Sequence, residues 1–216
     1  MEDKEHKNNN MKVSFAITVC NELEEIKRLI PFLFEHKRKE DEIVILYDEK
    51  NGNPEILDFL LPYNKFPHVQ TWRGFGFEGN FADWKNKLNE YCSGDYIYQL
   101  DADEMISEYI IKNICQILEM NPDVDLIFVP RINTVEGITQ EDINKWGWQV
   151  NDKGWINWPD AQGRIFRKGM NFYGKVHERI VGGQKFSSLP LDEEYCIQHH
   201  KDIARQEKQN NLYSSL

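Results

Sequence analysis

The stretch Tyr96-Ile97-Tyr98-Gln99-Leu100-Asp101-Ala102-Asp103-Glu104 joins an apolar run to an acidic turn. The apolar run predicts a buried strand, and the spacing of the isoleucines in residues 107–119 predicts a helix directly after the turn. Because side chains alternate along a strand, the carboxylates of Asp101 and Asp103 leave the strand end on the same side and can converge on one hard cation. The stretch therefore indicates a metal-binding turn. The alternative is an ordinary solvated turn between a strand and a helix.

The preceding residues repeat this order of strand and helix. Apolar patterns predict strands at residues 13–19, 43–47 and 68–72, and helical periodicity predicts helices at residues 23–33, 55–61 and 80–91. Repeated β-α units give a right-handed, mostly parallel sheet with helices on its faces. Such sheets bind ligands at the carboxyl ends of their strands, where polar clusters lie at residues 18–22, 48–53 and 101–104. We therefore predict an α/β fold with a Rossmann-like sheet.

The pattern changes after a further strand at residues 125–131. Residues 133–160 are polar, contain four tryptophans and show little periodicity, which predicts a long functional loop. Short strands at residues 162–167, 175–181 and 195–198 predict a smaller mixed β region, and a polar tail follows. We expect residues 1–11 to be a disordered tail and residues 12–216 to form a single domain.

Composition narrows the classes of function. The chain has 26 basic and 36 acidic residues and a formal charge of −10, which argues against wide binding to a nucleic-acid backbone. Its four cysteines are far apart and form no Cys-x-x-Cys pair, so we expect free thiols in a reducing compartment. The sequence contains no stretch that is long and apolar enough to span a bilayer. These observations predict a cytoplasmic protein, with peripheral association at the inner membrane surface as an option.

The chain resembles the family 2 glycosyltransferases of GT-A fold over about residues 12–205. The resemblance rests on segments in a fixed order, namely Thr18-Val19-Cys20-Asn21-Glu22, Asp48, Lys85-Asn86 and residues 101–104. Two later segments, Asp-Ala-Gln-Gly-Arg-Ile-Phe-Arg at residues 160–167 and Gly-Lys-Val-His-Glu at residues 174–178, resemble the small lipopolysaccharide-type sugar transferases within that family. The chain departs from the family pattern at Cys20, at residues 50–53 and at Lys85, which bears on the nucleotide base and sugar more than on the fold.

The resemblance implies a glycosyltransferase of the hexosyltransferase type (EC 2.4) with a GT-A fold and a smaller mixed β region on the acceptor side. Such an enzyme would move a single sugar from a nucleotide-diphosphate sugar, with UDP as the expected nucleotide, to a hydroxyl acceptor, with inversion. The acceptor would be a glycan, a lipid-linked molecule or another hydroxyl compound. Residues 12–104 would bind the donor, residues 105–200 the acceptor, and residues 201–216 would form a C-terminal lid or helix.

Two other functions stay open. One is a glucosyltransferase that acts on hydroxymethylated nucleic-acid bases, which the acidic balance of the chain disfavours. The other is a carbohydrate-binding module without catalytic activity, which would not need the acidic turn.

The resemblance also assigns residues to the donor. Contacts with the base, the ribose and the diphosphate would come from Thr18, Glu22, Asp48, Lys85 and Asp101. Lys201 and Arg205, just beyond the last strand, can fold over the diphosphate, and the alternative for both is an ordinary solvated position on a helix. The Asp48 carboxylate would accept a hydrogen bond from an imide N–H such as that of uracil. Asp48 can instead be an Asx-turn residue, and Lys85 can instead be a solvated lysine on a helix.

A divalent cation, Mn²⁺ or Mg²⁺, is implied beside the diphosphate. Asp103 would be its direct ligand, with Asp101 on the same side, and a histidine near the end of the last strand would complete the site. Nitrogen ligands suit Mn²⁺ better than Mg²⁺. Adjacent strand residues point in opposite directions, so only one of His199 and His200 can reach the metal, and we predict His200. The alternative is a pair of histidines without a metal.

The chemistry also requires a base. The cation and basic side chains stabilise the charge on the departing diphosphate, and a carboxylate takes the proton of the acceptor hydroxyl. We predict Glu178 as this base and Asp160 as the second choice. Either residue can instead be a structural ion-pair partner of a nearby arginine, for which the sequence offers Arg164, Arg167 and Arg179.

The tryptophans of the long loop are candidates for the acceptor side, because sugars present C–H faces that stack on aromatic rings. They are Trp146, Trp148, Trp155 and Trp158. We expect at least two of them to pack in the core instead.

Overall fold

The computed structural model describes residues 11–215, so the predicted tail lies outside the described residues except for Met11. The strands of the main sheet are β1 (Val13–Val19), β2 (Glu42–Asp48), β3 (Val69–Gly74), β4 (Tyr96–Asp101), β5 (Glu104–Met105), β6 (Leu126–Glu136), β7 (Asp160–Arg167), β10 (Phe186–Ser188) and β11 (Ile197–Asp202). A separate hairpin consists of β8 (Asn171–Tyr173) and β9 (Arg179–Val181). The α-helices are α1 (Leu23–His36), α2 (Glu55–Leu60), α3 (Phe81–Tyr91), α4 (Glu108–Met120), α5 (Gln140–Trp146) and α6 (Ile203–Ser215).

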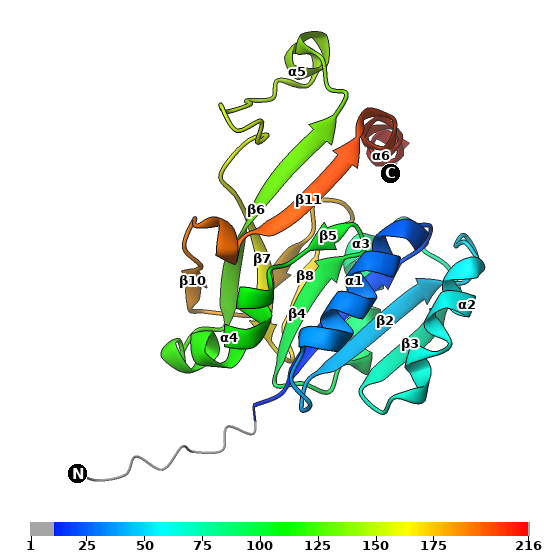
Figure 1. Ribbon diagram of the computed structural model, residues 1–216, viewed down its shortest axis with the longest axis vertical. Helices are drawn as coiled ribbons and strands as arrows, with labels where there is room; N and C mark the ends of the chain where they lie inside the picture. The colour runs from blue at the N-terminus through cyan, green and yellow to red at the C-terminus, as the bar shows by residue number, and fades with distance from the viewer. Residues whose placement is uncertain (1–10, 216) are drawn as a thin grey trace.

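The main sheet has the order β3-β2-β1-β4-β7-β6-β11-β5, with β10 paired to β6 (Figure 1). β1 pairs in parallel with β2 and β4, and β2 pairs in parallel with β3, as the β-α repeats predict. β7 is antiparallel to both of its neighbours, β4 and β6, and begins the mixed region. β11 is parallel to β6 and antiparallel to β5. The predicted α/β fold is confirmed.

Helices cover both faces of the parallel half of the sheet (Figure 1). α1 and α4 pack on one face through leucines and isoleucines at helical spacing, and α3 packs on the other. α4 begins where its sequence predicts, because the Ser107 hydroxyl accepts a hydrogen bond from the backbone N–H of Ile110 at 3.1 Å. The carboxyl ends of the paired strands β1, β2 and β4 form one continuous edge of this packed sheet.

The region after residue 131 differs from its prediction. β6 continues to Glu136, and α5 lies inside the segment that was expected to be a loop. α5 has a capping box between Thr139 and Asp142 but buries no residue, so it lacks the apolar periodicity by which a helix is recognised. Residues 175–181 do not form one strand, because a turn precedes β9 and His177 in that turn has a φ of 54°.

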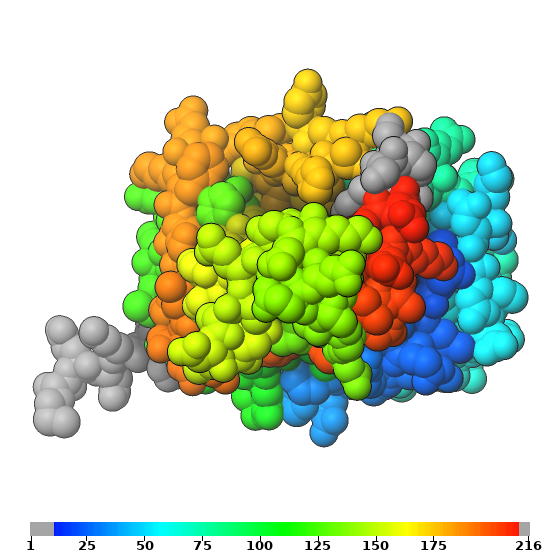
Figure 2. All heavy atoms as spheres, turned by 90° about the horizontal axis from the view of Figure 1, so that it is seen from above, coloured from blue at the N-terminus to red at the C-terminus, as the bar shows by residue number. Residues whose placement is uncertain are grey.

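Figure 2 looks onto the end of the molecule that carries α5 and α6. The segment of α5 (yellow-green) lies in the middle of this face, and α6 (red) lies beside it. The tail from residue 203 is therefore a helix, one of the two forms that the sequence predicted.

Candidate functional site

A row of side chains with alternating charge lies at the carboxyl end of β4. Each neighbour in the row forms an ion pair with the next, and the members come from α3, β4 to β7 and the turn before β9. In order they are Glu178, Lys85, Asp101, Arg164, Glu104, Arg131 and Asp160. We call this set the charged row. It connects the two predicted bases, Glu178 and Asp160, through the acidic turn.

The centre of the charged row is buried. Glu104 is fully buried and accepts hydrogen bonds from the guanidinium groups of Arg131, at 3.0 Å, and Arg164. Its other oxygen accepts the backbone N–H of Asp101 at 3.0 Å, which fixes the acidic turn. Burial opposes the charge of Asp101, yet the charges of Arg164 and Lys85 hold the pKa of Asp101 well below its ordinary value. No individual role was predicted for Glu104, whose partners Arg131 and Arg164 lie far away along the chain.

Lys85 occupies a position between Asp101 and Glu178. Its ammonium lies 3.0 Å from the Asp101 carboxylate and 2.7 Å from the Glu178 carboxylate, and the residue is only 5% exposed. The alternative of a solvated helix lysine is therefore wrong. Through Lys85 the structure brings Glu178 next to the acidic turn.

Asp160 lies at the other end of the charged row. Its carboxylate pairs with Arg131 at 2.8 Å and accepts a hydrogen bond from the Asn133 side chain at 2.8 Å. Burial alone would raise the pKa of Asp160, but the charge of Arg131 and the hydrogen bonds of Asn133 and Arg131 lower it overall. Asp160 thus has an arginine partner, although not one of the three that the sequence suggested.

Three basic or imidazole side chains surround Asp103. One carboxylate oxygen of Asp103 lies 3.4 Å from His199, 3.6 Å from Lys201 and 3.4 Å from Arg205. Burial opposes the charge of Asp103, but the hydrogen bond and charge of His199 and the charge of Lys201 keep its pKa below the ordinary value. β11 and α6 therefore place basic and imidazole side chains around Asp103, the second aspartate of the acidic turn.

The two histidines of β11 point to opposite sides, as strand geometry requires. His199 lies at Asp103, and its other ring nitrogen contacts the Asn133 side-chain oxygen at 2.8 Å. His200 instead contacts Thr134 at 2.8 Å, lies 3.7 Å from Glu136, and its side chain is 62% exposed. The structure does not bring His200 to the acidic turn. Strand alternation predicts that one histidine is excluded but not which one.

The donors at the acidic turn suit a divalent cation that is shared with a diphosphate. Among the described residues no three metal-binding side chains come together closely enough to hold an ion alone. Asp103 and His199 provide one carboxylate and one imidazole, and Mg²⁺ or Mn²⁺ commonly completes such a set with phosphate oxygens. Both oxygens of Asp101 are engaged by Lys85 and Arg164. The set therefore fits the expected cation at Asp103 and His199 better than at Asp101.

The residues predicted to contact the diphosphate also tie α6 to the body of the domain. Arg205 forms an ion pair with Glu25 of α1 and lies 3.9 Å from Glu22, in addition to its contact with Asp103. Lys201 is buried between Asp103 and the side chain of Gln209. Burial lowers the pKa of Lys201, although the charge of Asp103 opposes this effect. These contacts hold α6 against α1 and the acidic turn.

Thr18 and Glu22 lie at the end of β1, beside the acidic turn. Thr18 is in register with Asp101 across the β1–β4 pairing. Glu22 is the N-cap residue of α1, and its carboxylate accepts the backbone N–H groups of Cys20 at 2.8 Å and Asn21 at 2.9 Å. Glu22 therefore shapes the loop after β1, where the prediction placed the nucleotide.

The carboxylate of Asp48 is hydrogen-bonded within the loop that follows β2 and to Phe77. The residue is 2% exposed, and its carboxylate accepts hydrogen bonds from the backbone N–H groups of Lys50, Asn51 and Phe77 and from the Asn51 side chain. Burial would raise the pKa of Asp48, and these hydrogen bonds lower it overall. The Asx turn, the alternative in the sequence analysis, is what the structure shows. A base edge could bind here only after an internal donor moved away.

The tryptophans of the loop fall into two pairs. Trp146 and Trp148 pack on each other with ring centroids 4.6 Å apart at the end of α5. Trp155 and Trp158 form a T-shaped pair with centroids 4.8 Å apart, directly before β7. None of the four is fully buried, so the expectation that at least two belong to the core is wrong.

Comparison with known sequences and structures gives one family and one fold. The family model described as Glycosyl transferase family 2 matches residues 14–180. No curated protein matches the chain. Among solved structures, a fragment of S. aureus TarS, 1–349, is similar with a TM-score of 0.63, 14% sequence identity, and coverage of 88% of this chain and 60% of that chain.

The same fragment has also been solved with ligands. Its complex with UDP matches with a TM-score of 0.63 and 14% identity over 87% of this chain and 60% of the other. Its complex with UDP-GlcNAc matches with a TM-score of 0.62 and 15% identity over 88% of this chain and 59% of the other. This chain thus spans about 60% of the length of the TarS fragment, and the likeness shows that both have the GT-A fold.

Proposed function

The chain belongs to glycosyl transferase family 2, and from this premise we propose that it moves a single sugar from a nucleotide-diphosphate sugar to a hydroxyl acceptor, with inversion. The complexes of TarS with UDP and UDP-GlcNAc support a UDP-sugar as the donor. The observation that carries the proposal is the convergence of His199, Lys201 and Arg205 on Asp103 at the carboxyl edge of the sheet. This edge is where α/β sheets bind nucleotides.

The proposal assigns the leaving diphosphate to the surroundings of Asp103. Negative charge develops on the diphosphate as the sugar–phosphate bond breaks, and fixed positive groups in a partly buried site stabilise that charge. Lys201 and Arg205 supply two such groups without any large movement, since both already lie within 4 Å of Asp103. A divalent cation held by Asp103 and His199 would add Lewis-acid stabilisation of the same charge.

We propose Glu178 as the base that takes the proton of the acceptor hydroxyl. Its position beside Lys85 and Asp101 supports this role, because the base must lie close to the bond that breaks. Asp160 is the second candidate, and the low pKa that Arg131 and Asn133 impose on it makes it the weaker base. On this assignment Lys85 holds Asp101 and Glu178 at a fixed separation, which would align the donor and the acceptor.

A thermal-shift series tests the proposal. A ligand that binds only the folded state raises the apparent stability by mass action. We expect UDP and UDP-sugars to raise the unfolding midpoint, more strongly with Mn²⁺ than without it, and Asp103→Asn to lose the effect of Mn²⁺. Asp58→Asn, which changes an exposed carboxylate on α2, is the matched control and should behave like the wild type. If neutral sugars stabilise the protein and no nucleotide does, a carbohydrate-binding module is the better description.

The organisation of the chain follows the same proposal. We propose that residues 12–104 hold the donor, that residues 105–200 hold the acceptor and the base, and that residues 201–216 close over the diphosphate. Within residues 11–215 no helix combines the length and the apolar character that crossing a membrane requires. All four cysteines are unpaired thiols, which supports a location in the cytoplasm.

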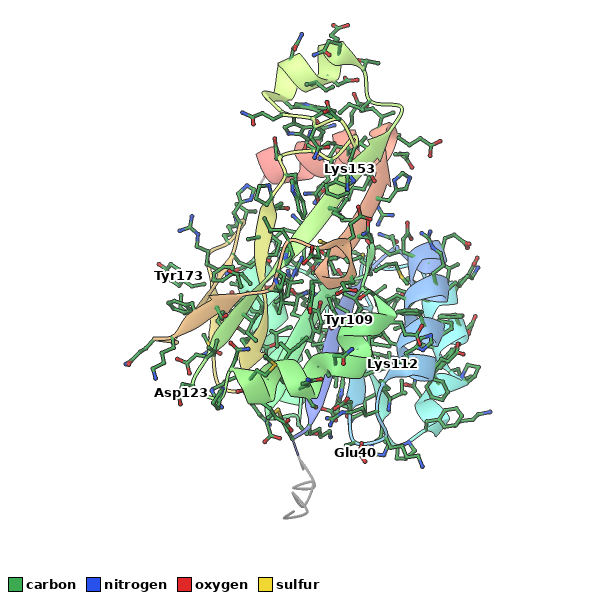
Figure 3. The ribbon with its side chains drawn as sticks, turned by 60° about the vertical axis from the view of Figure 1, so that its left-hand side comes forward. Glu40, Tyr109, Lys112, Asp123, Lys153 and Tyr173 are labelled. Atoms are coloured by element: carbon green, nitrogen blue, oxygen red, sulfur yellow. The ribbon has the colours of Figure 1, made fainter. Side chains whose placement is uncertain are left out.

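For the option of peripheral membrane association, the β8–β9 hairpin offers one surface. Residues 167–186 contain five basic residues and one acidic residue in a chain of net charge −10. Tyr173, Arg179 and Val181 lie on one exposed face of the hairpin, and Figure 3 shows Tyr173 at the edge of the molecule. Basic residues beside exposed apolar ones favour anionic lipid surfaces. Tyr173→Ser should weaken co-sedimentation with phosphatidylglycerol vesicles, whereas equal sedimentation of both proteins would remove this option.

A further inference from the structure

A groove with a volume of about 610 Å³ opens between the loop that precedes β7 and the segment that precedes β11. Its walls carry two indole rings and four charged side chains, namely Trp155, Trp158, Asp152, Lys153, Asp192 and Glu193. Lys153, which marks the loop in Figure 3, lies 4.4 Å above the Trp155 ring. The charged row does not extend into this groove, and of its residues only the two tryptophans have been named above, as candidates for the acceptor side.

The two indole rings are held on a rigid support. Ile156 lies between them in the sequence, is 4% exposed, and donates its backbone N–H to the carbonyl of Asn133 at 2.9 Å. This anchor turns Trp155 and Trp158 outward, so both are half-buried and keep part of their surface open to the groove. Lys153 covers one face of Trp155, so the aromatic surface open to a ligand consists of Trp158 and the rest of Trp155. A pre-formed aromatic surface loses little conformational entropy when a ligand stacks on it. Such a surface suits the C–H face of a sugar ring.

The charge of the groove restricts the ligand. Lys153 is the one basic residue among the described residues that line the groove, and it forms an ion pair with Glu193 at 2.7 Å. The carboxylates of Asp152 and Asp192 therefore give the walls a net negative charge. Like charges at short distance repel, so a phosphate-rich or uronic acid ligand is disfavoured. Carboxylates accept hydrogen bonds from hydroxyl groups, and a neutral sugar offers several. Aromatic faces and acceptor oxygens together match a neutral carbohydrate.

The position of the groove connects it to the charged row. Trp158 precedes Asp160, the end of the row, by two residues. Asn133, which anchors Ile156, also contacts Asp160 at 2.8 Å and His199 at 2.8 Å. Asn133 therefore links the wall of the groove to Asp160 and to His199 of the proposed donor site.

We infer that this groove binds a neutral sugar residue of the acceptor, which makes a glycan with an uncharged unit near its reacting hydroxyl the class of acceptor. The inference rests on the proposed function, because the groove is read as the continuation of the transfer site. Its binding step is nevertheless separate from turnover and can be measured without donor.

The test uses the indole N–H signals of the ¹⁵N-labelled wild-type protein. Methyl glycosides of glucose, galactose, mannose and N-acetylglucosamine are the neutral probes, and glucuronic acid and glycerol phosphate are the anionic ones. We expect at least one neutral probe to shift the signals of Trp155 and Trp158 and to leave those of Trp146 and Trp148 in place. Shifts confined to the second pair, shifts by anionic probes only, or no shift with any probe would overturn the inference.

Variants give a second measurement. Trp155→Ala should weaken binding of the neutral probe by roughly tenfold, which corresponds to about 1.4 kcal/mol. Trp155→Phe, which keeps an aromatic face, should retain part of the affinity, and Trp148→Ala, outside the groove, should match the wild type. Equal affinity of Trp155→Ala and Trp148→Ala would contradict the inference. UDP binding is measured on the same samples, so a protein that binds the probe but no nucleotide refutes the proposed function and leaves the groove assigned.

Discussion

Ionised side chains are buried at both ends of the parallel strands, but their partners differ. We call the end where the strands begin the amino edge and the end where they finish the carboxyl edge. At the amino edge, Glu42 is 1% exposed and accepts hydrogen bonds from Lys12 at 2.7 Å, from Ser14 at 2.6 Å and from the backbone and side chain of Ser93. At the carboxyl edge, one oxygen of Asp103 faces three basic or imidazole groups at 3.4 to 3.6 Å. Only the first carboxylate has all its partners at full hydrogen-bond distance.

This difference indicates that Glu42 has a structural role, whereas the groups around Asp103 are available to a ligand. The amino-edge cluster is closed around Glu42, since both of its carboxylate oxygens accept hydrogen bonds from the protein itself. The carboxyl edge holds several positive groups around one carboxylate, and a ligand with phosphate oxygens could exchange partners with them. Burial of charge alone therefore does not mark a site. Changes at the carboxyl edge should affect activity, and changes at the amino edge should affect stability.

The largest effect is expected from Asp103→Asn. Loss of this charge removes the proposed metal ligand and the group that organises His199, Lys201 and Arg205. We expect no measurable transfer and no Mn²⁺-dependent nucleotide binding, with an unchanged circular dichroism spectrum. Transfer assays and nucleotide titrations with and without Mn²⁺ check this. Normal dependence on Mn²⁺ in the variant would break the contrast between the two edges.

The next prediction concerns Glu178, which forms an ion pair with Lys85, and tests whether this carboxylate is the base. Glu178→Gln should keep the affinity for nucleotide and lower the transfer rate by roughly two to four orders of magnitude, as loss of a general base does. Single-turnover rates with saturating donor measure the chemical step. Asp160→Asn is the matched variant at the other end of the charged row, and the roles must be exchanged if only that variant shows the loss.

The parallel half of the fold and its edge could be predicted because their signals are local. The strand at residues 96–101, the cap at Ser107 and the polar clusters at strand ends depend on neighbours in the sequence. The charged row could not be predicted in the same way. Arg164 reaches Glu104 across 60 positions, and which of two adjacent histidines faces Asp103 depends on the pairing of β11 with β5.

Residues 133–160 were predicted least well, for a related reason. α5 buries no residue, and the loop before β7 is held by one backbone hydrogen bond to β6, from Ile156 to Asn133, and by hydrogen bonds within the loop. Neither segment therefore shows the apolar periodicity by which helices and strands are recognised. Asp48 shows that a local signal and a family signal can coincide at one residue. Its position after a strand matched a ligand contact in the family, while its local turn took up both of its oxygens.

A pH series tests the closed cluster at the amino edge. Burial opposes the charge of Glu42, but hydrogen bonds from Lys12, Ser14 and Ser93 lower the pKa of Glu42 to about 2. A carboxylate whose pKa is lower in the folded than in the unfolded state stabilises the fold above its unfolded pKa of about 4.3. That contribution, about 3 kcal/mol, is lost as the pH falls from about 5 toward 2.

The variant that isolates this contribution is Glu42→Gln. Denaturant unfolding at several pH values should show lower stability than the wild type near neutral pH and a shallower loss on acidification. Nucleotide binding per folded molecule should be unchanged, because Glu42 lies at the edge opposite the proposed site. A variant of normal stability that binds nucleotide poorly would reverse the roles assigned to the two edges.

The smallest effect is expected at α6, where Arg205 contacts both α1 and the acidic turn. Arg205 pairs with Glu25 and contacts Asp103, so it can hold α6 closed without a donor and can turn to the diphosphate when a donor binds. Arg205→Ala should raise the dissociation constant of UDP by roughly three- to tenfold, the effect of one partly exposed charged hydrogen bond. Lys208→Ala, an exposed cation on the same helix, is the control for net charge. Hydrogen exchange in residues 203–211 should slow on addition of UDP and Mn²⁺ in the wild type and not in Arg205→Ala. Exchange that UDP leaves unchanged in both proteins would mean that α6 is a fixed part of the fold, and the carboxyl edge would then be closed in the same sense as the amino edge.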